Sequence, residues 1–264
     1  MTPNLPKNPL APFALEIPEI RVGMLVPSSN TALEPMTSAL AAPVSDRVGV
    51  HYSRFEVTRI ALDQNADAQF LLDPILNAAR LLADAKVSVI AWNGTSASWR
   101  GFDTDDKLCA AIEKETGCPA TSAIVALNAA LGHFGTRRLG LVTPYTEDVE
   151  AAIIANYATI GIEIVAARRC NLQDNYSFAD VPPARVADMC REVAAQGVDA
   201  VAIVCTNMRG PLIAAQIEAE FGIPVLDSIA VTLWGTLNML GVDSRPLAPF
   251  GKLFTVAPDD PEHL

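Results

Sequence analysis

The chain has 264 residues, and its five cysteines, at positions 109, 118, 170, 190 and 205, are its most nucleophilic side chains. Their number is odd and no two stand in a C-x-x-C spacing, so neither a disulfide framework nor a zinc site is expected. Cys205 differs from the others because it ends the apolar run Asp199–Cys205 and precedes a predicted helix that starts near Pro211. Helix N-termini favour the thiolate, so a cysteine there can be acidic and exchangeable. Cys205 is therefore either a small buried apolar residue or a reactive thiol, whereas the other four are expected to be buried.

Hydroxyl groups follow the ends of two other apolar runs. Thr95 and Ser96 come directly after a glycine, Gly94, and Tyr145 comes directly after a proline. Hydroxyls and adjacent backbone N–H groups can bind an anionic oxygen, and a glycine lets a ligand approach the backbone closely. The alternatives are that Thr95 and Ser96 cap a helix or turn and that Tyr145 packs at a rim. The residues alone leave both interpretations open.

Other catalytic signatures are missing from the sequence. The three histidines, His51, His133 and His263, do not fall at predicted strand ends, so a histidine triad or a histidine metal site is not expected. Neither a G-x-G-x-x-G fingerprint nor a phosphate-binding G-K-[ST] motif is present, and Asn93–Ala97 does not match the G-x-S-x-G nucleophile elbow.

Short apolar runs alternate with helical patterns along the chain. The predicted strands are 21–26, 48–57, 87–92, 138–143, 162–167, 199–205 and a short one at 225, and the predicted helices are 66–85, 103–116, 121–134, 147–160, 183–196, 211–221 and 228–240. Strands that alternate with helices of about 10–15 residues indicate βαβ units and parallel sheets. The fold class is therefore α/β.

Two such series of similar length indicate two pseudo-symmetric lobes, each a parallel sheet flanked by helices. We place lobe one at residues 20–118 plus 227–255, lobe two at 119–226, and loosely ordered tails at 1–19 and 256–264. The segment from Leu247 onward is expected to pack loosely because it is rich in proline and acidic residues.

Parallel sheets bind ligands beyond the carboxyl ends of their strands. Four loops follow predicted strands there, and each has a distinctive composition: Pro27–Asn30, Gly94–Gly101, Pro144–Tyr145 and Cys205–Gly210. We therefore expect a candidate site where these loops meet.

The composition argues against some classes of binding partner, namely nucleic acids and membranes. Thirty acidic residues against nineteen basic ones give a net charge of −11, which argues against a nucleic-acid-binding protein. The longest apolar runs are shorter than the roughly 20 residues needed to span a bilayer, and residues 1–18 lack a signal-like apolar core. We expect a cytoplasmic protein with a small-molecule substrate and no membrane partner, and the oligomeric state stays open.

Several motifs in residues 20–255 resemble the Asp/Glu racemase superfamily. Val22–Asn30 resembles the opening of its maleate isomerase branch, and Gly94–Gly101 and Phe250–Phe254 are similar to its arylmalonate decarboxylase branch. Three further stretches fit both branches: Thr121–Val149, Ala202–Cys205 and Gly222–Val225. The resemblance is closest to arylmalonate decarboxylase, with maleate isomerase-like features.

This resemblance implies two α/β lobes with an active site in the cleft between them, and most members carry one cysteine in each lobe. Here Gly94 stands at the first-lobe position and only Cys205 remains. Racemisation through a carbanion needs an acid–base group on each face of the carbon, which glycine does not supply. A single thiol matches the decarboxylase pattern: a 2-substituted (aryl- or alkenyl-) malonate loses CO2, and the enediolate is protonated on one face. No metal and no organic cofactor are implied.

The resemblance also assigns roles, with Cys205 as the proton donor to a small carboxylate substrate. Four residues are implied to hydrogen-bond the enediolate, the last through its backbone: Thr95, Ser96, Tyr145 and Thr206. Pro27, Asn30 and Gly94 are further implied pocket residues, and Trp99 and Met208 are candidates for apolar walls that favour the loss of CO2.

Two alternatives remain. In the isomerases an asparagine helps to bind a substrate carboxylate, so Asn30 supports an isomerase or racemase of a small dicarboxylate or amino acid. The third possibility is a non-catalytic carboxylate-binding protein on the same scaffold.

Overall fold

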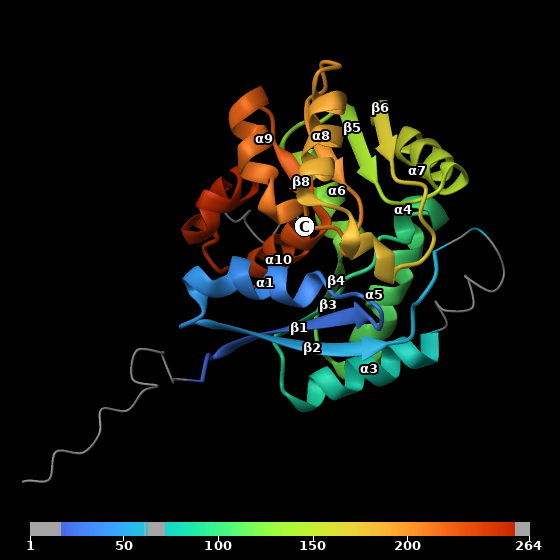
Figure 1. The fold of residues 1–264 in the computed structure, drawn as a ribbon. Coiled ribbons are helices and arrows are strands. Elements are labelled where there is room, and N and C mark those ends of the chain that lie inside the picture. The colour runs from blue at the N-terminus through green and yellow to red at the C-terminus, as the bar shows by residue number, and fades with distance from the viewer. Residues whose placement is uncertain (1–16, 61, 63–71, 257–264) are drawn as a thin grey trace, which may run out of the picture.

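Two parallel sheets flanked by helices make up the molecule, as Figure 1 shows for the computed structural model, which describes residues 17–60, 62 and 72–256. The first sheet has the strand order β2-β1-β3-β4 and the second the order β6-β5-β7-β8. The strands are β1 (Ile20–Pro27), β2 (Val48–Phe55), β3 (Val89–Trp92), β4 (Ala120–Ser122), β5 (Arg138–Thr143), β6 (Glu163–Arg169), β7 (Ala200–Ile203) and β8 (Val225–Asp227). Both sheets thus repeat one arrangement, and the predicted α/β fold with two pseudo-symmetric lobes is confirmed.

The central strands are continuous apolar runs because helices cover both faces of each sheet. Every residue of β3, β7 and β8 is buried, and β5 is exposed only at its first residue, Arg138. The helices are α1 (Leu33–Ala41), α3 (Leu72–Asp84), α4 (Ala97–Arg100), α5 (Asp103–Thr116), α6 (Ala123–His133), α7 (Glu147–Thr159), α8 (Pro183–Ala194), α9 (Ala214–Phe221) and α10 (Ser228–Met239).

The lobes are joined by helices as well as by loops. Helices α6 and α10, which follow the last strands of the two sheets, pack against each other, and a Cβ atom at Gly235 would lie only 2.8 Å from the Cβ of Ala126. In α7 the Asn156 side chain donates hydrogen bonds to the carbonyls of Ala97 (3.0 Å) and Ser98 (3.1 Å) in α4. Helix α4, which carries the loop after β3, is therefore held by the second lobe.

Two expectations differ from the structure. Strand β4 pairs with β3, so the first sheet extends to Ser122, beyond residue 118, where we expected lobe one to end. Its three residues are too few to show a strand period in the sequence, and the last two, Thr121 and Ser122, fall within the predicted helix 121–134, which begins at Ala123 in the structure. The part of the predicted helix 66–85 before α3 lies outside the described residues, as do residues 1–16 and 257–264 of the predicted tails.

The expectation of loose packing from Leu247 onward is wrong for the described residues. Leu247, Leu253 and Phe254 are buried in two consecutive 3-10 segments. The Glu218 carboxylate accepts hydrogen bonds from the backbone N–H groups of Lys252 (2.7 Å) and Val225 (2.9 Å). The segment is therefore fixed to the second sheet by a buried carboxylate, which composition alone does not reveal.

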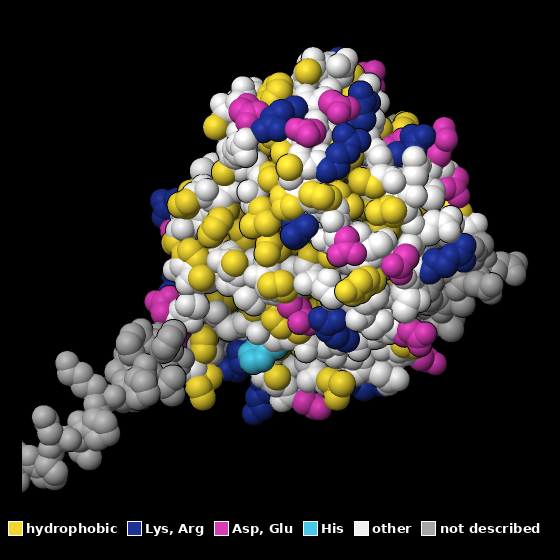
Figure 2. Space-filling model, in the orientation of Figure 1, with side chains coloured by type: hydrophobic (Ala, Val, Ile, Leu, Met, Phe, Trp, Pro, Cys, Tyr) yellow, Lys and Arg dark blue, Asp and Glu magenta, His cyan; other side chains and the backbone are white. Residues whose placement is uncertain are grey.

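Charged side chains are dispersed over the surface. On the face drawn in Figure 2, Lys and Arg side chains lie among Asp and Glu side chains and do not gather into one basic patch. Several are paired, as Arg191 is with Glu220 (2.7 Å), although such surface pairs contribute only about 0–1 kcal/mol each. None of the helices in the described part of the chain has the length and apolar character needed to cross a lipid bilayer.

Candidate active site

The loops after β1, β3, β5 and β7 meet around one small cavity of about 20 Å³. This is room for about one water molecule. The cavity is lined by Pro27, Val57, Ile60, Trp92, Gly94, Thr95, Ser96, Trp99, Tyr145, Asn175, Cys205 and Thr206. It thus brings together the site residues expected from the sequence except Asn30 and the candidate wall residue Met208.

Cys205 lies two residues beyond the end of β7 and is 2% exposed. Burial raises the pKa of its thiol to about 12, against the opposing effects of a hydrogen bond from the Asn207 backbone and one with the Tyr145 side chain. Asp227, also buried, adds to the rise in this pKa. The group is therefore a thiol at neutral pH.

The expected helix N-terminus next to Cys205 is absent. A loop follows β7, and the helix α9 begins only at Ala214, after a 3-10 turn at Gly210–Leu212. One backbone N–H, that of Asn207, points to the sulfur at 3.3 Å. Desolvation outweighs this contact, which is why the pKa moves up rather than down.

Tyr145 and Thr95 join the two lobes across the cavity. The Thr95 hydroxyl and the Tyr145 phenol are 2.6 Å apart, and Tyr145 also packs edge-on against the ring of Trp99 (centroids 5.2 Å apart). Burial, followed by the charge of Cys205, raises the pKa of Tyr145 well above its usual value. The phenol therefore keeps its proton and can donate it in a hydrogen bond to an anion.

Ser96 and Thr206 flank this pair. Ser96 precedes α4, but its side chain makes no capping hydrogen bond to that helix, so its buried hydroxyl is left to line the cavity. The Thr206 hydroxyl donates to the carbonyl of Asn93 in the first lobe (2.9 Å). Its side chain therefore holds the Cys205 loop in place.

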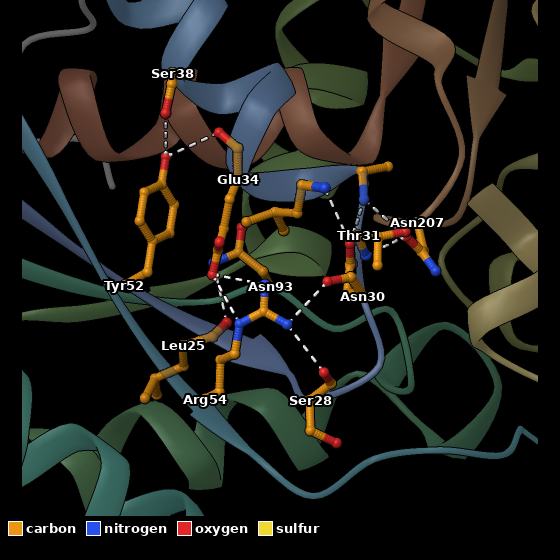
Figure 3. Close-up of polar contacts among 12 residues, drawn as sticks. Leu25, Ser28, Asn30, Thr31, Glu34, Ser38, Tyr52, Arg54, Asn93 and Asn207 are labelled. Carbon is orange, nitrogen blue, oxygen red and sulfur yellow. Dashed lines mark hydrogen bonds and ion pairs between the residues drawn. The ribbon is translucent and has the colours of Figure 1, made fainter.

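Asn30 is not among the lining residues, because both ends of its amide group are engaged elsewhere. Its Nδ2 donates to the Thr206 carbonyl (2.9 Å), and its Oδ1 accepts from the N–H groups of Ala32 (3.1 Å) and Leu33 (2.9 Å) at the start of α1. Figure 3 shows Asn30 beside Asn207, and Arg54 donating to the carbonyls of Ser28 and Asn30. Asn30 thus fastens the second-lobe loop to the first lobe.

Two further asparagines of the second lobe were missed in the sequence. Asn207 accepts hydrogen bonds from the N–H groups of Thr31 and Ala32 (both 3.0 Å), so it holds the turn that leads into α1 of the other lobe. Asn175 lines the cavity and donates to the hydroxyl of Ser29 (2.8 Å). Their partners lie more than a hundred positions away in the chain, so no local signal could have identified them.

A short backbone pairing borders the cavity, since Val57, Ile60 and Asn175 are among the lining residues. Residues 57–60 of the first lobe run antiparallel to residues 173–175 of the second. The N–H of Ile60 donates to the carbonyl of Gln173 (2.9 Å), and that of Asn175 donates to the carbonyl of Thr58 (3.0 Å). Val57 and Ile60 contribute apolar wall together with Trp99, whereas Met208, the other expected wall residue, is buried but does not line the cavity.

The arrangement places a neutral thiol near several hydroxyl groups, which are groups that can donate hydrogen bonds to an anion. Within the described residues, no three His, Cys, Asp or Glu side chains are grouped closely enough to hold a metal ion. Proton transfer to a carbon atom next to a carboxylate is the chemistry that these groups can perform.

Comparisons with known proteins identify the family of the chain. A family model described as arylmalonate decarboxylase matches residues 22–254. The chain is 25% identical over 236 residues to the arylmalonate decarboxylase of Bordetella bronchiseptica, which covers 88% of this chain and 95% of the relative. It is 27% identical over 240 residues to the maleate isomerase of Pseudomonas putida, with coverage of 87% and 94%.

Solved structures share the fold. A mutant maleate cis-trans isomerase of Nocardia farcinica with a covalently bound succinylcysteine intermediate has a TM-score of 0.80 at 23% identity, covering 91% of this chain and 99% of that one. A liganded double mutant of arylmalonate decarboxylase has a TM-score of 0.78 at 23% identity, covering 89% and 98%. The expected resemblance is confirmed, and with a family model that spans residues 22–254, the chain belongs to the arylmalonate decarboxylase family.

Proposed function

We propose that this protein decarboxylates 2-substituted (aryl- or alkenyl-) malonates without a cofactor, through an enediolate that Cys205 protonates on one face. The observation that carries the proposal is a cavity in which a buried, protonated thiol accompanies three hydroxyl groups and the corresponding loop of the other lobe contributes Gly94. A reducing compartment such as the cytoplasm keeps the thiol in the form that the reaction needs.

The retained carboxylate of the substrate binds to the hydroxyls of Thr95, Ser96 and Tyr145. When the carbon–carbon bond to the other carboxylate breaks, CO2 leaves and the bonding electrons move into the retained carboxylate, which becomes an enediolate. Each preorganised donor that strengthens its bond to this developing charge lowers the barrier by about 2.7–4 kcal/mol. The α-carbon then takes the proton of Cys205, and the thiolate recovers a proton from water.

The high pKa of Cys205 fits a late proton transfer. Burial raises this pKa to about 12, so the thiol is too weak an acid to protonate a carboxylate but can protonate a strongly basic carbon. Because Gly94 presents no acid on the opposite side, the product is a single enantiomer whenever the α-carbon is stereogenic.

The test is turnover of phenylmalonate and vinylmalonate, followed as CO2 release and monoacid formation, in the wild type and in Cys205→Ser. We expect wild-type turnover and its loss in the variant, and a single solvent deuterium in one configuration when the reaction runs in D2O. Undiminished turnover by Cys205→Ser would falsify the role of the thiol. Thermal stabilisation by malonates without any turnover would instead indicate a carboxylate-binding protein.

The maleate isomerase relatives favour a second candidate, an isomerase or racemase of a small dicarboxylate or amino acid. It is supported less by the residues, because the amide of Asn30 is already bonded at both ends and Gly94 has no side chain. Conversion of maleate to fumarate, or α-deuteration of a substrate in D2O without CO2 release, would favour this candidate over the decarboxylase.

A further inference from the structure

Gly94 is covered by an indole ring. A Cβ atom built at Gly94 would overlap Cζ2 and Cε2 of the Trp92 side chain, so the indole occupies the space that a side chain at position 94 would need. Trp92 is 1% exposed, and its ring packs against that of Phe55 with centroids 5.0 Å apart. The indole is therefore a fixed part of the cavity wall on the first-lobe side.

The same indole borders a second, larger pocket. This pocket has a volume of about 240 Å³, and it shares Trp92 and Ser96 with the catalytic cavity of about 20 Å³. Its other lining residues are Leu72, Ile75, Arg100, Thr104, Asp105, Lys107 and Leu108. Trp92 and Ser96 thus form the partition between the two spaces, and the indole is by far the bulkier of the two side chains.

We propose that Trp92 determines the specificity of this site: its indole closes the face of the reacting carbon opposite Cys205 and excludes large substituents from the pocket behind it. This inference rests on the proposed function and narrows it, because it places the preferred substrates at the small, alkenyl end of the 2-substituted malonates. Shortening Trp92 joins the two spaces, and an aryl group can then extend past Ser96 toward Ile75.

The activity test uses a series of malonates with vinyl, phenyl and naphthyl substituents at C2, each of which stabilises the developing carbanion by conjugation. We expect wild-type kcat/KM to fall along this series, and Trp92→Leu to raise the naphthyl-to-vinyl ratio of kcat/KM at least about tenfold, the size of effect that apolar pocket contacts produce. Trp234→Leu, which removes a buried indole bordering neither space, is the control for lost stability and should keep the wild-type ratio.

A second control distinguishes the effect of the larger pocket's volume from the effect of Trp92, which separates that pocket from the catalytic cavity. Ile75→Ala enlarges the larger pocket and leaves Trp92 in place, so alone it should not change the ratio. Combined with Trp92→Leu it should raise the ratio further, because the substituent then reaches position 75. An unchanged ratio in Trp92→Leu, or a change produced by Ile75→Ala alone, overturns the proposal.

Two readouts do not depend on turnover. Calorimetric binding of the corresponding monoacids should show the same size preference, with Trp92→Leu gaining affinity for naphthylacetate and losing its preference for the smaller acids. In thermal unfolding, Gly94→Ala should lower the melting temperature of the wild type and have little effect in Trp92→Leu, where the overlap is removed. If no variant releases CO2 but the binding and unfolding results are as expected, the decarboxylase function is wrong and the role of Trp92 stands. If CO2 is released but neither the binding nor the unfolding result is as expected, the decarboxylase function stands and the role of Trp92 is wrong.

Discussion

The third strands of the two sheets, β3 and β7, end at equivalent positions, but the residues at and after these ends differ. Trp92 ends β3 and Ile203 ends β7, and each pairs with the last residue of the fourth strand of its own sheet. Two positions further along, Gly94 therefore corresponds to Cys205. Lobe one has a large indole and no side chain at the reacting position, whereas lobe two has a smaller aliphatic residue and a thiol.

The residues that follow keep the symmetry. Thr95 corresponds to Thr206, and each threonine bonds to the opposite lobe, the first to the Tyr145 phenol (2.6 Å) and the second to the Asn93 carbonyl (2.9 Å). The polar contacts that hold the lobes together are thus matched, while the reactive positions are not. Under the proposed function, positions 92 and 94 would make the chemistry one-sided, while the contacts that join the lobes are kept.

The largest expected effect comes from removing the thiol that distinguishes lobe two. Cys205→Ala should lower kcat/KM about 10³-fold, because a positioned general acid typically contributes 10²–10⁴-fold. Cys190→Ala is the matched control: it removes a buried thiol in α8 whose pKa burial also raises to about 12, but which does not line the cavity. Retention of more than a tenth of the activity by Cys205→Ala would contradict the comparison.

The second-largest effect is expected from the hydroxyl groups of Thr95 and Tyr145, which are hydrogen-bonded to each other across the two lobes. Tyr145→Phe should lower kcat about 10²-fold, the cost of losing one anion donor, and Thr95→Val should do the same. Because a 2.6 Å hydrogen bond links the two groups, the double variant should lose less than the product of the single effects. Tyr157→Phe, which removes a buried hydroxyl without a partner in the described residues, should leave kcat unchanged; a loss equal to that of Tyr145→Phe would point to packing instead.

A thiol at position 94 would make the lobes alike. Gly94→Cys should be destabilised by about 1–3 kcal/mol, since its side chain meets the Trp92 indole, and Trp92→Leu in the same chain should relieve most of this cost. The double variant presents a thiol to each face, so its monoacid product should lose optical purity. Denaturant unfolding and chiral chromatography measure the two effects, and a single variant as stable as the wild type would show that the indole does not fill this space.

The last prediction concerns stability and its pH dependence, at the residues that begin α6 and α10. Ser122 caps α6, whereas Asp227 caps α10 by accepting N–H bonds, and burial raises the pKa of Asp227 from 3.8 to about 8. Because the folded protein holds this proton more tightly than the unfolded chain, the stabilisation is complete below about pH 4 and is lost as the pH rises to about 8. Asp227→Ser should flatten this decline, although Asp105, whose pKa burial raises to about 7, retains part of it. Denaturant midpoints at pH 5 and pH 8 test this, and an unchanged decline would exclude Asp227 as its source.

The sequence allowed the loops of the site to be predicted because each follows a buried apolar strand with a residue of distinct chemistry. The role of Trp92 could not be predicted, since a tryptophan that ends a strand has the pattern of an ordinary core residue. Asn30 was expected to face substrate, but an asparagine amide can equally bond backbone, and only the fold shows which partners lie within reach. Strand β4 and the packing at Leu253 could not be predicted either. The strand is too short to show the alternation of a β-strand, and the packing depends on contacts with residues that are distant in the chain.

The pairing of residues 57–60 with 173–175 has a consequence for the timing of the reaction. Its two backbone hydrogen bonds contribute only about 0.5–1.5 kcal/mol each, so they add little to the energy that holds the two segments together. A carbanion that is protonated while this pairing is intact takes its proton from the protein interior. A carbanion that survives until the pairing opens can take a proton from bulk solvent on either face. In the proposed mechanism, a single product enantiomer therefore requires that the carbanion is protonated before this stretch of backbone pairing opens.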